Sequence, residues 1–282
     1  MKRIYVSIDA EGLPGIFHLS QMSPDGKLFY ELREIMARIV KILHEELKKY
    51  GYEMWVADSH GFMGNISYLD LPNDVYLIRG SLRPLSMVFG IDRGFNAAMF
   101  IGYHPAAGTP RGIAEHTYSG ATFQEIRINN VRSSEFYINA LVAGYYNVPI
   151  VLVAGDNTLK RDVEEISPST VYVEFKESIS RFSGLMKPLN IVERELREGV
   201  GLAIERLERG LIKPLRIDPP IKARYVMRRS DYADAGEEIP GMKRVDAYTL
   251  EYETRSIIEV YKVMKVLALL SSAIDSLTRQ YA

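Results

Sequence analysis

The apolar run at residues 4–8 ends in two carboxylates, Asp9 and Glu11, followed by Gly12. A short apolar run of this kind predicts a buried strand near the start of the chain. Because side chains alternate along a strand, Asp9 and Glu11 are expected on one face at its carboxyl end. Two carboxylates that close repel each other unless a cation lies between them. This stretch alone therefore fits either a solvated strand end before a glycine turn or a metal site.

The composition narrows the classes of function. The chain has 282 residues, of which 47% are hydrophobic and 25% charged, and its net charge is -1. These values predict a globular protein of one large domain, or of one domain with a smaller companion, and they offer no basic surface for nucleic acid. Cysteine is absent, which excludes disulfides, thiolate metal sites and a cysteine nucleophile. No run approaches about 18 apolar residues, so we expect no membrane span and a cytoplasmic protein.

The order of the predicted elements indicates the fold class. A helix with apolar residues three and four apart is expected at 28–50, between the first strand and a second strand at 53–58. Strand, helix and strand in this order form a unit with parallel strands. Further strands are expected at 75–78, 95–102, 122–129, 149–155, 170–175, 221–228 and 244–252, and further helices at 136–146, 192–209 and 255–279. We predict an α/β fold with a mostly parallel sheet and flanking helices in residues 1–180, plus a smaller α+β portion in residues 181–282.

Candidate ligands follow the ends of separate strands. His60 follows the strand at 53–58, and His104 follows the strand at 95–102. Ligands of open α/β sheets bind at the carboxyl ends of the strands, so these histidines and the carboxylates after the first strand are expected to gather at one edge. Imidazoles together with carboxylates suit zinc, manganese, cobalt or iron. Each histidine alone is more often a surface or hydrogen-bonded residue, but together they predict a metal site.

Short motifs in a fixed order resemble one known family. They are the sequence at 7–12, Asp58-Ser59-His60, Gly102-Tyr103-His104, Glu115-His116 in a loop rich in glycine and proline, Glu135 ahead of Asn139-Ala140 and of 143–146, and the sequence at 153–156. Over nearly its whole length the chain resembles the zinc-dependent D-aminopeptidases of the bacterial dipeptide-permease operon, which are binuclear metallopeptidases. One departure is the loop before His116, which is slightly longer at Arg111-Gly112.

The resemblance implies roles for the candidate residues. Asp9 corresponds by position to a carboxylate that bridges two zinc ions. His116 corresponds to a catalytic histidine that is not a metal ligand. Without the resemblance, the simpler interpretation of His116 is a loop residue that is hydrogen-bonded to a backbone carbonyl. The resemblance also implies two Zn2+ ions per chain, with Co2+ or Mn2+ as possible substitutes, and a homo-oligomer, which is a decamer in the family. The remaining ligands, not divided between the two metals, are Glu11, His60, His104 and Glu135.

The activity that the resemblance implies is hydrolysis of short peptides or amino-acid amides with a free amino terminus, preferably a D-residue such as D-Ala. Two metals would activate a water, and His116 would stabilise the oxyanion or pass a proton to the leaving amine. The loops at 12–26 and 105–120 are expected to wall the pocket. The alternatives are another two-metal hydrolase, either an amidase or a phosphoesterase, and a non-catalytic metal-stabilised assembly protein. We find no glycine-rich phosphate loop that would favour the phosphoesterase.

Neighbouring polar residues have simpler interpretations. Asp58 and Ser59 are expected to orient His60 rather than to bind metal. Asp156, after the strand at 149–155, could support a metal ligand or cap the N-terminus of a helix. His18 and His44 are expected at the surface.

Overall fold

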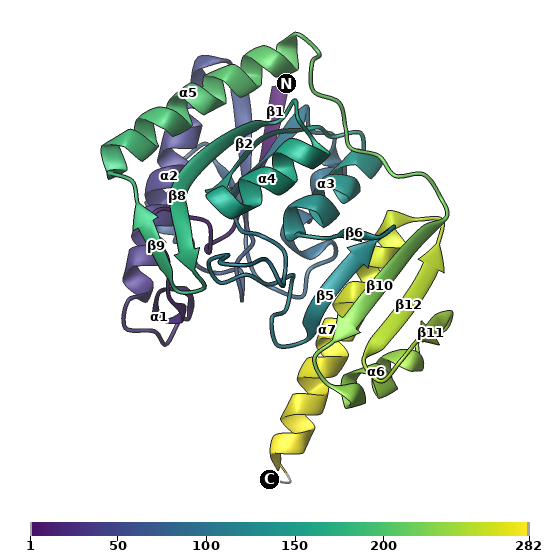
Figure 1. Cartoon of the computed structure of the whole chain (residues 1–282). Coiled ribbons are helices and arrows are strands. Elements are labelled where there is room, and N and C mark those ends of the chain that lie inside the picture. The colour runs from purple at the N-terminus through teal and green to yellow at the C-terminus, as the bar shows by residue number, and fades with distance from the viewer. Residues whose placement is uncertain (1, 281–282) are drawn as a thin grey trace.

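The computed structural model describes residues 2–280 and arranges them around two β-sheets (Figure 1). The larger sheet has seven strands in the order β3-β2-β1-β4-β7-β8-β9. All its neighbouring strands are parallel except β8 and β9. The predicted fold class, a mostly parallel α/β sheet with flanking helices, is confirmed. The strands are β1 (Lys2–Ile8), β2 (Tyr52–Asp58), β3 (Tyr76–Ile78), β4 (Ala97–Tyr103), β7 (Ile150–Asp156), β8 (Val171–Ser180) and β9 (Ser183–Met186).

Strand β1 lies inside the sheet, and its alternate side chains enter two separate cores. Ile4 and Val6 contact the core beneath α2 (Phe29–Lys49) and α5 (Leu189–Glu208). Tyr5 enters the opposite core, which contains residues of α3 (Glu135–Tyr145), α4 (Asn157–Ile166) and α7 (Ile257–Gln280). Helices therefore cover both faces of the sheet, as a buried parallel sheet requires. The loops at the carboxyl ends of the strands are left to form the candidate site.

The smaller sheet is antiparallel, with the strand order β11-β12-β10-β5-β6. Two of its strands come from the middle of the chain, and α5 packs on the larger sheet although it follows residue 181. The division into residues 1–180 and 181–282 stays a prediction, and the two sheets do not separate the chain at that point. The strands are β5 (Phe123–Ile128), β6 (Val131–Arg132), β10 (Ile221–Met227), β11 (Met242–Arg244) and β12 (Thr249–Thr254).

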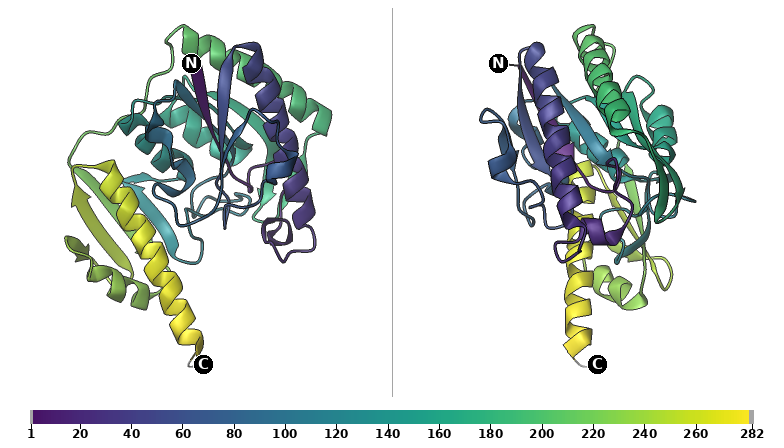
Figure 2. Two further views of the ribbon diagram at one scale, coloured as in Figure 1. Left: turned by 180° about the vertical axis from the view of Figure 1, so that it is seen from behind. Right: turned by 90° about the vertical axis from the view of Figure 1, so that its left-hand side faces the viewer.

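Helix α7 packs against elements of both sheets' surroundings, and so joins the part built on the larger sheet to the part built on the smaller sheet. It packs on α3, on strands β10 and β12, and on α6 (Ser230–Glu237). Figure 2 shows that it runs along the smaller sheet and projects beyond it toward the C-terminus. Met264 and Leu267 are buried in the core, whereas Leu269 and Leu277 are exposed. Within residues 2–280, every helix is either too short or too polar to span a lipid bilayer.

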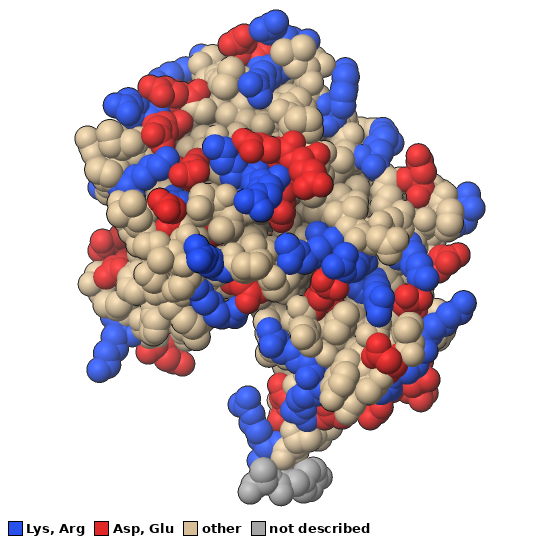
Figure 3. All heavy atoms as spheres, in the orientation of Figure 1, with Lys and Arg blue, Asp and Glu red and all other residues tan. Residues whose placement is uncertain are grey.

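Charged side chains are mixed on the surface. In Figure 3, Lys and Arg lie beside Asp and Glu over most of the visible face. Several of these charges form ion pairs, such as Lys2 with Glu208 at 2.8 Å. This face therefore lacks the continuous positive stripe that is typical of nucleic-acid-binding proteins.

Two local features differ from the predicted elements. The run at 244–252, predicted as one strand, is divided between β11 and β12 because Asp246 accepts hydrogen bonds from the backbone N–H groups of Tyr248 and Thr249 and so forms a turn. The stretch after β7 forms α4, which we did not predict from the sequence. Asp156 caps this helix, since its Oδ1 accepts the Leu159 N–H at 2.9 Å. Of the two roles considered for Asp156, the structure supports the N-cap.

A buried lysine fixes the loop that follows β1. Lys176 of β8 has no exposed surface, and its Nζ donates to the carbonyl oxygens of Glu11, Leu13 and Ile16 at 2.5, 2.8 and 2.5 Å. Burial lowers the pKa of Lys176 to about 7. The three carbonyl acceptors nevertheless match the three donors of a protonated ammonium group. One side chain thus ties three points of this loop to the sheet.

Replacing Lys176 by Met should destabilise the fold, because three buried carbonyl oxygens lose their donor. At about 1 kcal/mol for each unsatisfied group, the expected loss is about 3 kcal/mol in the free energy of unfolding. The measurement is the urea midpoint at a fixed protein concentration. The exposed Lys213→Met serves as the matched control. Equal midpoints for the two variants would show that the loop does not depend on Lys176.

Candidate metal centre

The loop after β1 holds Asp9 and Glu11 against the end of β4. The Gly12 N–H donates to the Gly102 carbonyl at 2.8 Å. A Cβ on Gly12 would lie 2.0 Å from the Tyr103 carbonyl oxygen, so only glycine permits this close approach of the two backbones. Asp9 and Glu11 are only 2% and 5% exposed. Two buried carboxylates are therefore fixed at the carboxyl end of the larger sheet.

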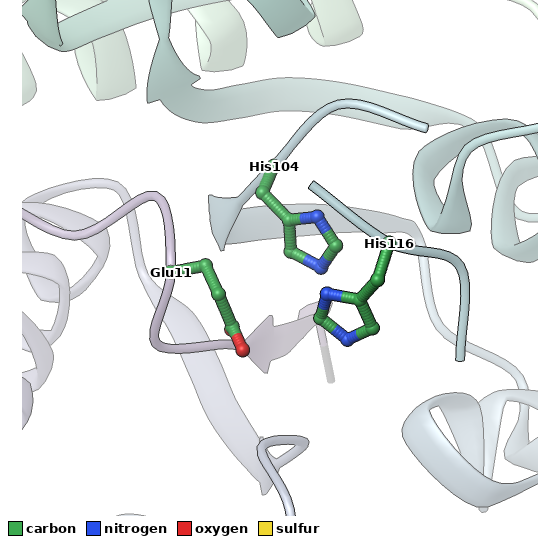
Figure 4. Close-up of side chains that lie close together, drawn as sticks. All are labelled: Glu11, His104 and His116. Carbon is green, nitrogen blue, oxygen red and sulfur yellow. The ribbon is translucent and has the colours of Figure 1, made fainter. Parts of the chain in front are cut away.

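The other candidate residues reach the same place from separate elements. His60 follows β2, His104 directly follows β4, and Glu135 is the first residue of α3. These three are buried, whereas His116, in the loop between β4 and β5, has a side chain that is 20% exposed. Figure 4 shows Glu11, His104 and His116 pointing toward one another from different segments. The structure thus brings together all six residues that the sequence and the resemblance single out.

Backbone carbonyls fix the orientation of all three imidazoles. A carbonyl can only accept a hydrogen bond, so the nitrogen that faces it carries the hydrogen of the neutral ring. The opposite nitrogen then presents its lone pair to the carboxylates. This is the arrangement in which protein histidines bind metal ions. The pairs are His60 Nε2 with the Met22 oxygen at 2.9 Å, His104 Nδ1 with the Pro105 oxygen at 3.0 Å, and His116 Nδ1 with the Ala114 oxygen at 2.9 Å.

Asp9 lies between two of these histidines. Its Oδ1 is 3.3 Å from Nδ1 of His60, and its Oδ2 is 3.6 Å from Nε2 of His104. Glu11 Oε2 is 3.1 Å from the same His60 nitrogen, and Glu135 Oε1 is 3.4 Å from the same His104 nitrogen. The ligand-type atoms form three overlapping groups, and the atoms of each group lie within 4.8 Å of one another. The groups are Asp9 with Glu11 and His60, Asp9 with His104 and Glu135, and Glu11 with His104 and His116.

The chemistry of this donor set fits a divalent metal. Nε2 of His104 is buried and has no hydrogen-bond partner among the described residues. A buried polar atom without a partner is rare and costly, and here it faces two carboxylates. A cation at this place would pair with the lone pair of His104 and neutralise Asp9 and Glu135. Nitrogen and oxygen donors without a thiolate suit zinc, cobalt or manganese.

The electrostatics of the cluster also favour positive charge. Burial and the neighbouring Glu11 raise the pKa of Asp9 well above its ordinary value. Burial opposes the ionisation of Glu11 too, but His60 beside it lowers the pKa of Glu11 well below its ordinary value. For His104, burial favours the neutral ring, yet Glu135 and the other carboxylates raise its pKa to about 10. The carboxylates therefore require protons or metal ions beside them.

His116 lies at the open side of the cluster. Its ring stacks on that of His104, with 4.3 Å between the centroids and 13° between the planes. Its Nε2 is 3.6 Å from Glu135 Oε1. Burial and the neighbouring His104 lower the pKa of His116, which favours the neutral ring. Because Nδ1–H is bonded to a carbonyl, the free Nε2 can accept a proton from a group in the pocket.

Asp58 and Ser59 act less directly on His60 than the sequence predicts. Asp58 accepts a hydrogen bond from the Asn65 side chain, which also donates to the His60 carbonyl, both at 2.8 Å. Ser59 instead pairs its hydroxyl with that of Ser7 at 2.7 Å. Asp58 therefore holds the backbone at His60 through Asn65, whereas the His60 ring is oriented by a backbone carbonyl.

Tyr118 is a neighbour of the cluster that no sequence pattern singles out. Its backbone N–H donates to Glu135 Oε1 at 2.7 Å, and its hydroxyl bonds to Asn139 and Tyr261 at 2.5 and 2.6 Å. Its φ of 59° is in the left-handed region.

The two remaining histidines lie outside the cluster, since His18 caps α1 (Leu19–Met22) and His44 pairs with Asp74 at 2.7 Å.

All the cluster residues except His104 line a cavity of about 560 Å³. As expected, the loop at 105–120 contributes to its wall, through His116 and Tyr118. Among the described residues, the loop at 12–26 does not line the cavity, so that expectation is wrong. Lys176 instead ties this loop to β8. The other wall residues come from the segments after β2 and β3 and from α7, and include Met63, Leu82, Met87, Met264 and Leu269.

Comparisons with known proteins agree with the resemblance. A curated D-aminopeptidase of Bacillus subtilis (strain 168) is 31% identical over 270 residues, which cover 94% of this chain and 96% of the relative. A solved structure is described as the Zn-dependent D-aminopeptidase DppA from Bacillus subtilis, a self-compartmentalizing protease. It matches with a TM-score of 0.90 and 29% identity, over 96% of this chain and 98% of that chain. A family model described as D-aminopeptidase matches residues 1–266, so the chain belongs to the D-aminopeptidase family.

Proposed function

We propose that this protein is a zinc-dependent aminopeptidase that removes D-residues such as D-Ala from the amino terminus of short peptides and amino-acid amides. The observation that carries the proposal is the position of Asp9, whose two carboxylate oxygens each face a different histidine, His60 and His104. A carboxylate in this position is suited to bridge two ions. Membership of the D-aminopeptidase family supports the aminopeptidase class. The similarity to a zinc-dependent relative supports zinc.

The proposed centre holds two zinc ions per chain. Asp9 would be shared, Glu11 and His60 would complete the protein ligands of one ion, and His104 and Glu135 those of the other. This division follows the two groups of ligand-type atoms that contain Asp9. When bound, the ions would supply a water of lowered pKa and a Lewis acid for the scissile carbonyl.

His116 is proposed as the catalytic proton-transfer residue. The Ala114 carbonyl holds its Nδ1–H, and the lowered pKa keeps Nε2 free to accept a proton. The protonated ring could then donate that proton to the leaving amine or pair with a developing oxyanion. Its side chain lines the cavity and is the most exposed of the candidate residues. A group that must meet substrate is expected in this position.

The apolar cavity wall favours a small peptide over a phosphoester. Methionine and leucine side chains form much of this wall. Among the described residues that line the cavity, Lys265 is the only lysine or arginine. A phosphoesterase would be expected to place several cations around a doubly charged group. We also propose a homo-oligomer, by the family resemblance a decamer. The relative described as self-compartmentalizing and the exposed apolar residues of α7 support this assembly.

Metal analysis after reconstitution with zinc should give two ions per chain. Asp9→Ala should lose both ions because it removes the shared ligand, whereas His60→Ala should mainly weaken one. The measurement is the metal content of dialysed protein by elemental analysis. The control is His44→Ala, because His44 lies outside the cluster and pairs with Asp74. A wild-type content near zero after reconstitution with zinc, cobalt or manganese would contradict the proposed centre.

His116→Ala should keep both metal ions and the fold but lower kcat by about 100-fold or more, the usual scale for a proton-transfer or oxyanion group. The reason is that His116 lines the cavity, and its Nδ1 is held by a carbonyl, which leaves Nε2 for proton transfer. Steady-state kinetics and metal content are measured on the same preparation. An unchanged kcat would reject the catalytic role, and the loss of an ion would identify His116 as a ligand instead.

The amide of D-Ala should be hydrolysed faster than that of L-Ala, and N-acetylation should abolish hydrolysis of both. The free amine defines an aminopeptidase, whereas the stereochemical preference depends on the cavity wall around Cα. The assay compares the four substrates with added zinc. Equal rates for acetylated and free amides would reject aminopeptidase action. Faster turnover of the L-form would reject the D-preference alone.

A further inference from the structure

One basic side chain lies in the cavity apart from the candidate metal ligands. Lys265 of α7 lines the same cavity as Asp9, Glu11 and Glu135. Its Nζ donates to the Arg83 carbonyl at 2.7 Å, which is the one partner that the described residues give it. An ammonium group has three donors, so two remain available. A cation of this kind, partly buried and paired only with a carbonyl, is suited to receive an anion.

The backbone that anchors Lys265 is itself fixed. The Arg83 guanidinium donates to the carbonyl oxygens of Asp58, Gly80 and Ser86 at 2.6, 3.2 and 2.8 Å. One helical turn before Lys265, the Tyr261 hydroxyl donates to the carbonyl of Leu85, two residues after Arg83, at 2.9 Å. Helix α7 is thus attached to this segment at two successive turns. The Lys265 ammonium is therefore held in place before any ligand binds, which lowers the entropic cost of binding.

We propose that Lys265 binds the C-terminal carboxylate of the substrate and so selects short peptides with a free carboxyl end. The inference rests on the proposed aminopeptidase function. There the scissile bond of the amino-terminal residue lies at the metal ligands, and the rest of the peptide extends along the cavity. Each further residue adds at most about 3.5 Å, so the carboxylate of a dipeptide lies only a few ångströms beyond the scissile bond, close to a cavity wall that includes Lys265.

A substrate carboxylate in this cavity needs a partner. Met63, Met87 and Met264 make the wall largely apolar, and Asp9 and Glu11 make the metal end acidic. Burying a carboxylate there without a cation would be costly, whereas Lys265 offers two donors. A C-terminal amide carries no charge and needs no such partner. Lys265 should therefore distinguish a peptide acid from the corresponding peptide amide.

The test compares D-Ala-D-Ala with its C-terminal amide, which differ only in the charge of the carboxyl end. The kcat/KM ratio of acid to amide should fall about 10-fold or more in Lys265→Gln, because a hydrogen bond to a charged group is lost. Glutamine can still donate to the Arg83 carbonyl, so the tether of α7 is kept. Lys265→Arg should restore part of the ratio. Lys262→Gln, on the exposed side of α7, is the matched control and should leave the ratio at the wild-type value.

The outcomes separate this inference from the proposed function. If the wild type hydrolyses both substrates and Lys265→Gln lowers kcat/KM for the acid and the amide by the same factor, Lys265 only tethers the helix and the inference is wrong. An unchanged ratio in Lys265→Gln overturns it as well. If the wild type releases alanine from neither the D- nor the L-form of the pair, the proposed function fails and the inference falls with it. Should only the L-form be a substrate, the same ratio is measured on the L-peptides.

Discussion

The burial of three carboxylates against three imidazoles is the constraint on which the candidate site depends. Asp9, Glu11 and Glu135 are each at most 5% exposed, and they converge at one edge of the larger sheet. Like charges at such distances in a low-dielectric interior are strongly unfavourable without compensating positive charge. Burial and the neighbouring Glu11 raise the pKa of Asp9, and Glu135 with the other carboxylates raises the pKa of His104 to about 10 although burial opposes it. A fold that keeps this arrangement therefore has to hold the side chains in place against their own repulsion.

The polar backbone of the surrounding loops provides that restraint. The carbonyls of Met22, Pro105 and Ala114 each fix one imidazole, so ring orientation depends on the path of the loops after β1 and β4. Lys176 in turn binds three carbonyls of the first of these loops, including that of Glu11. The same backbone thus serves ligand orientation and loop stability. A substitution that frees either loop is expected to disturb the site even when every ligand is retained.

The parts of the site that follow strands could be predicted from the sequence, because the carboxyl ends of parallel strands meet at one edge. This argument reached Asp9, Glu11, His60 and His104. Glu135 begins a helix and His116 lies inside a loop, so no strand-end pattern marks them, and only the family resemblance selected them. The pairing of β5 with β10 also escaped prediction. The alternation at 122–129 indicates a strand but not its partner, which lies about a hundred residues further along the chain.

Lys265 shows the same limit for the substrate pocket. In the sequence it is one of several charged residues on a long amphipathic helix, and nothing local distinguishes it from Lys262. Only the packing of α7 on the segment at 81–88 turns one of the two lysines into the cavity. The candidate ligands come from the larger sheet and α3, whereas this wall comes from a helix that packs on the smaller sheet. Substitutions on α7 are therefore expected to change which peptide the proposed enzyme accepts without altering the candidate metal ligands.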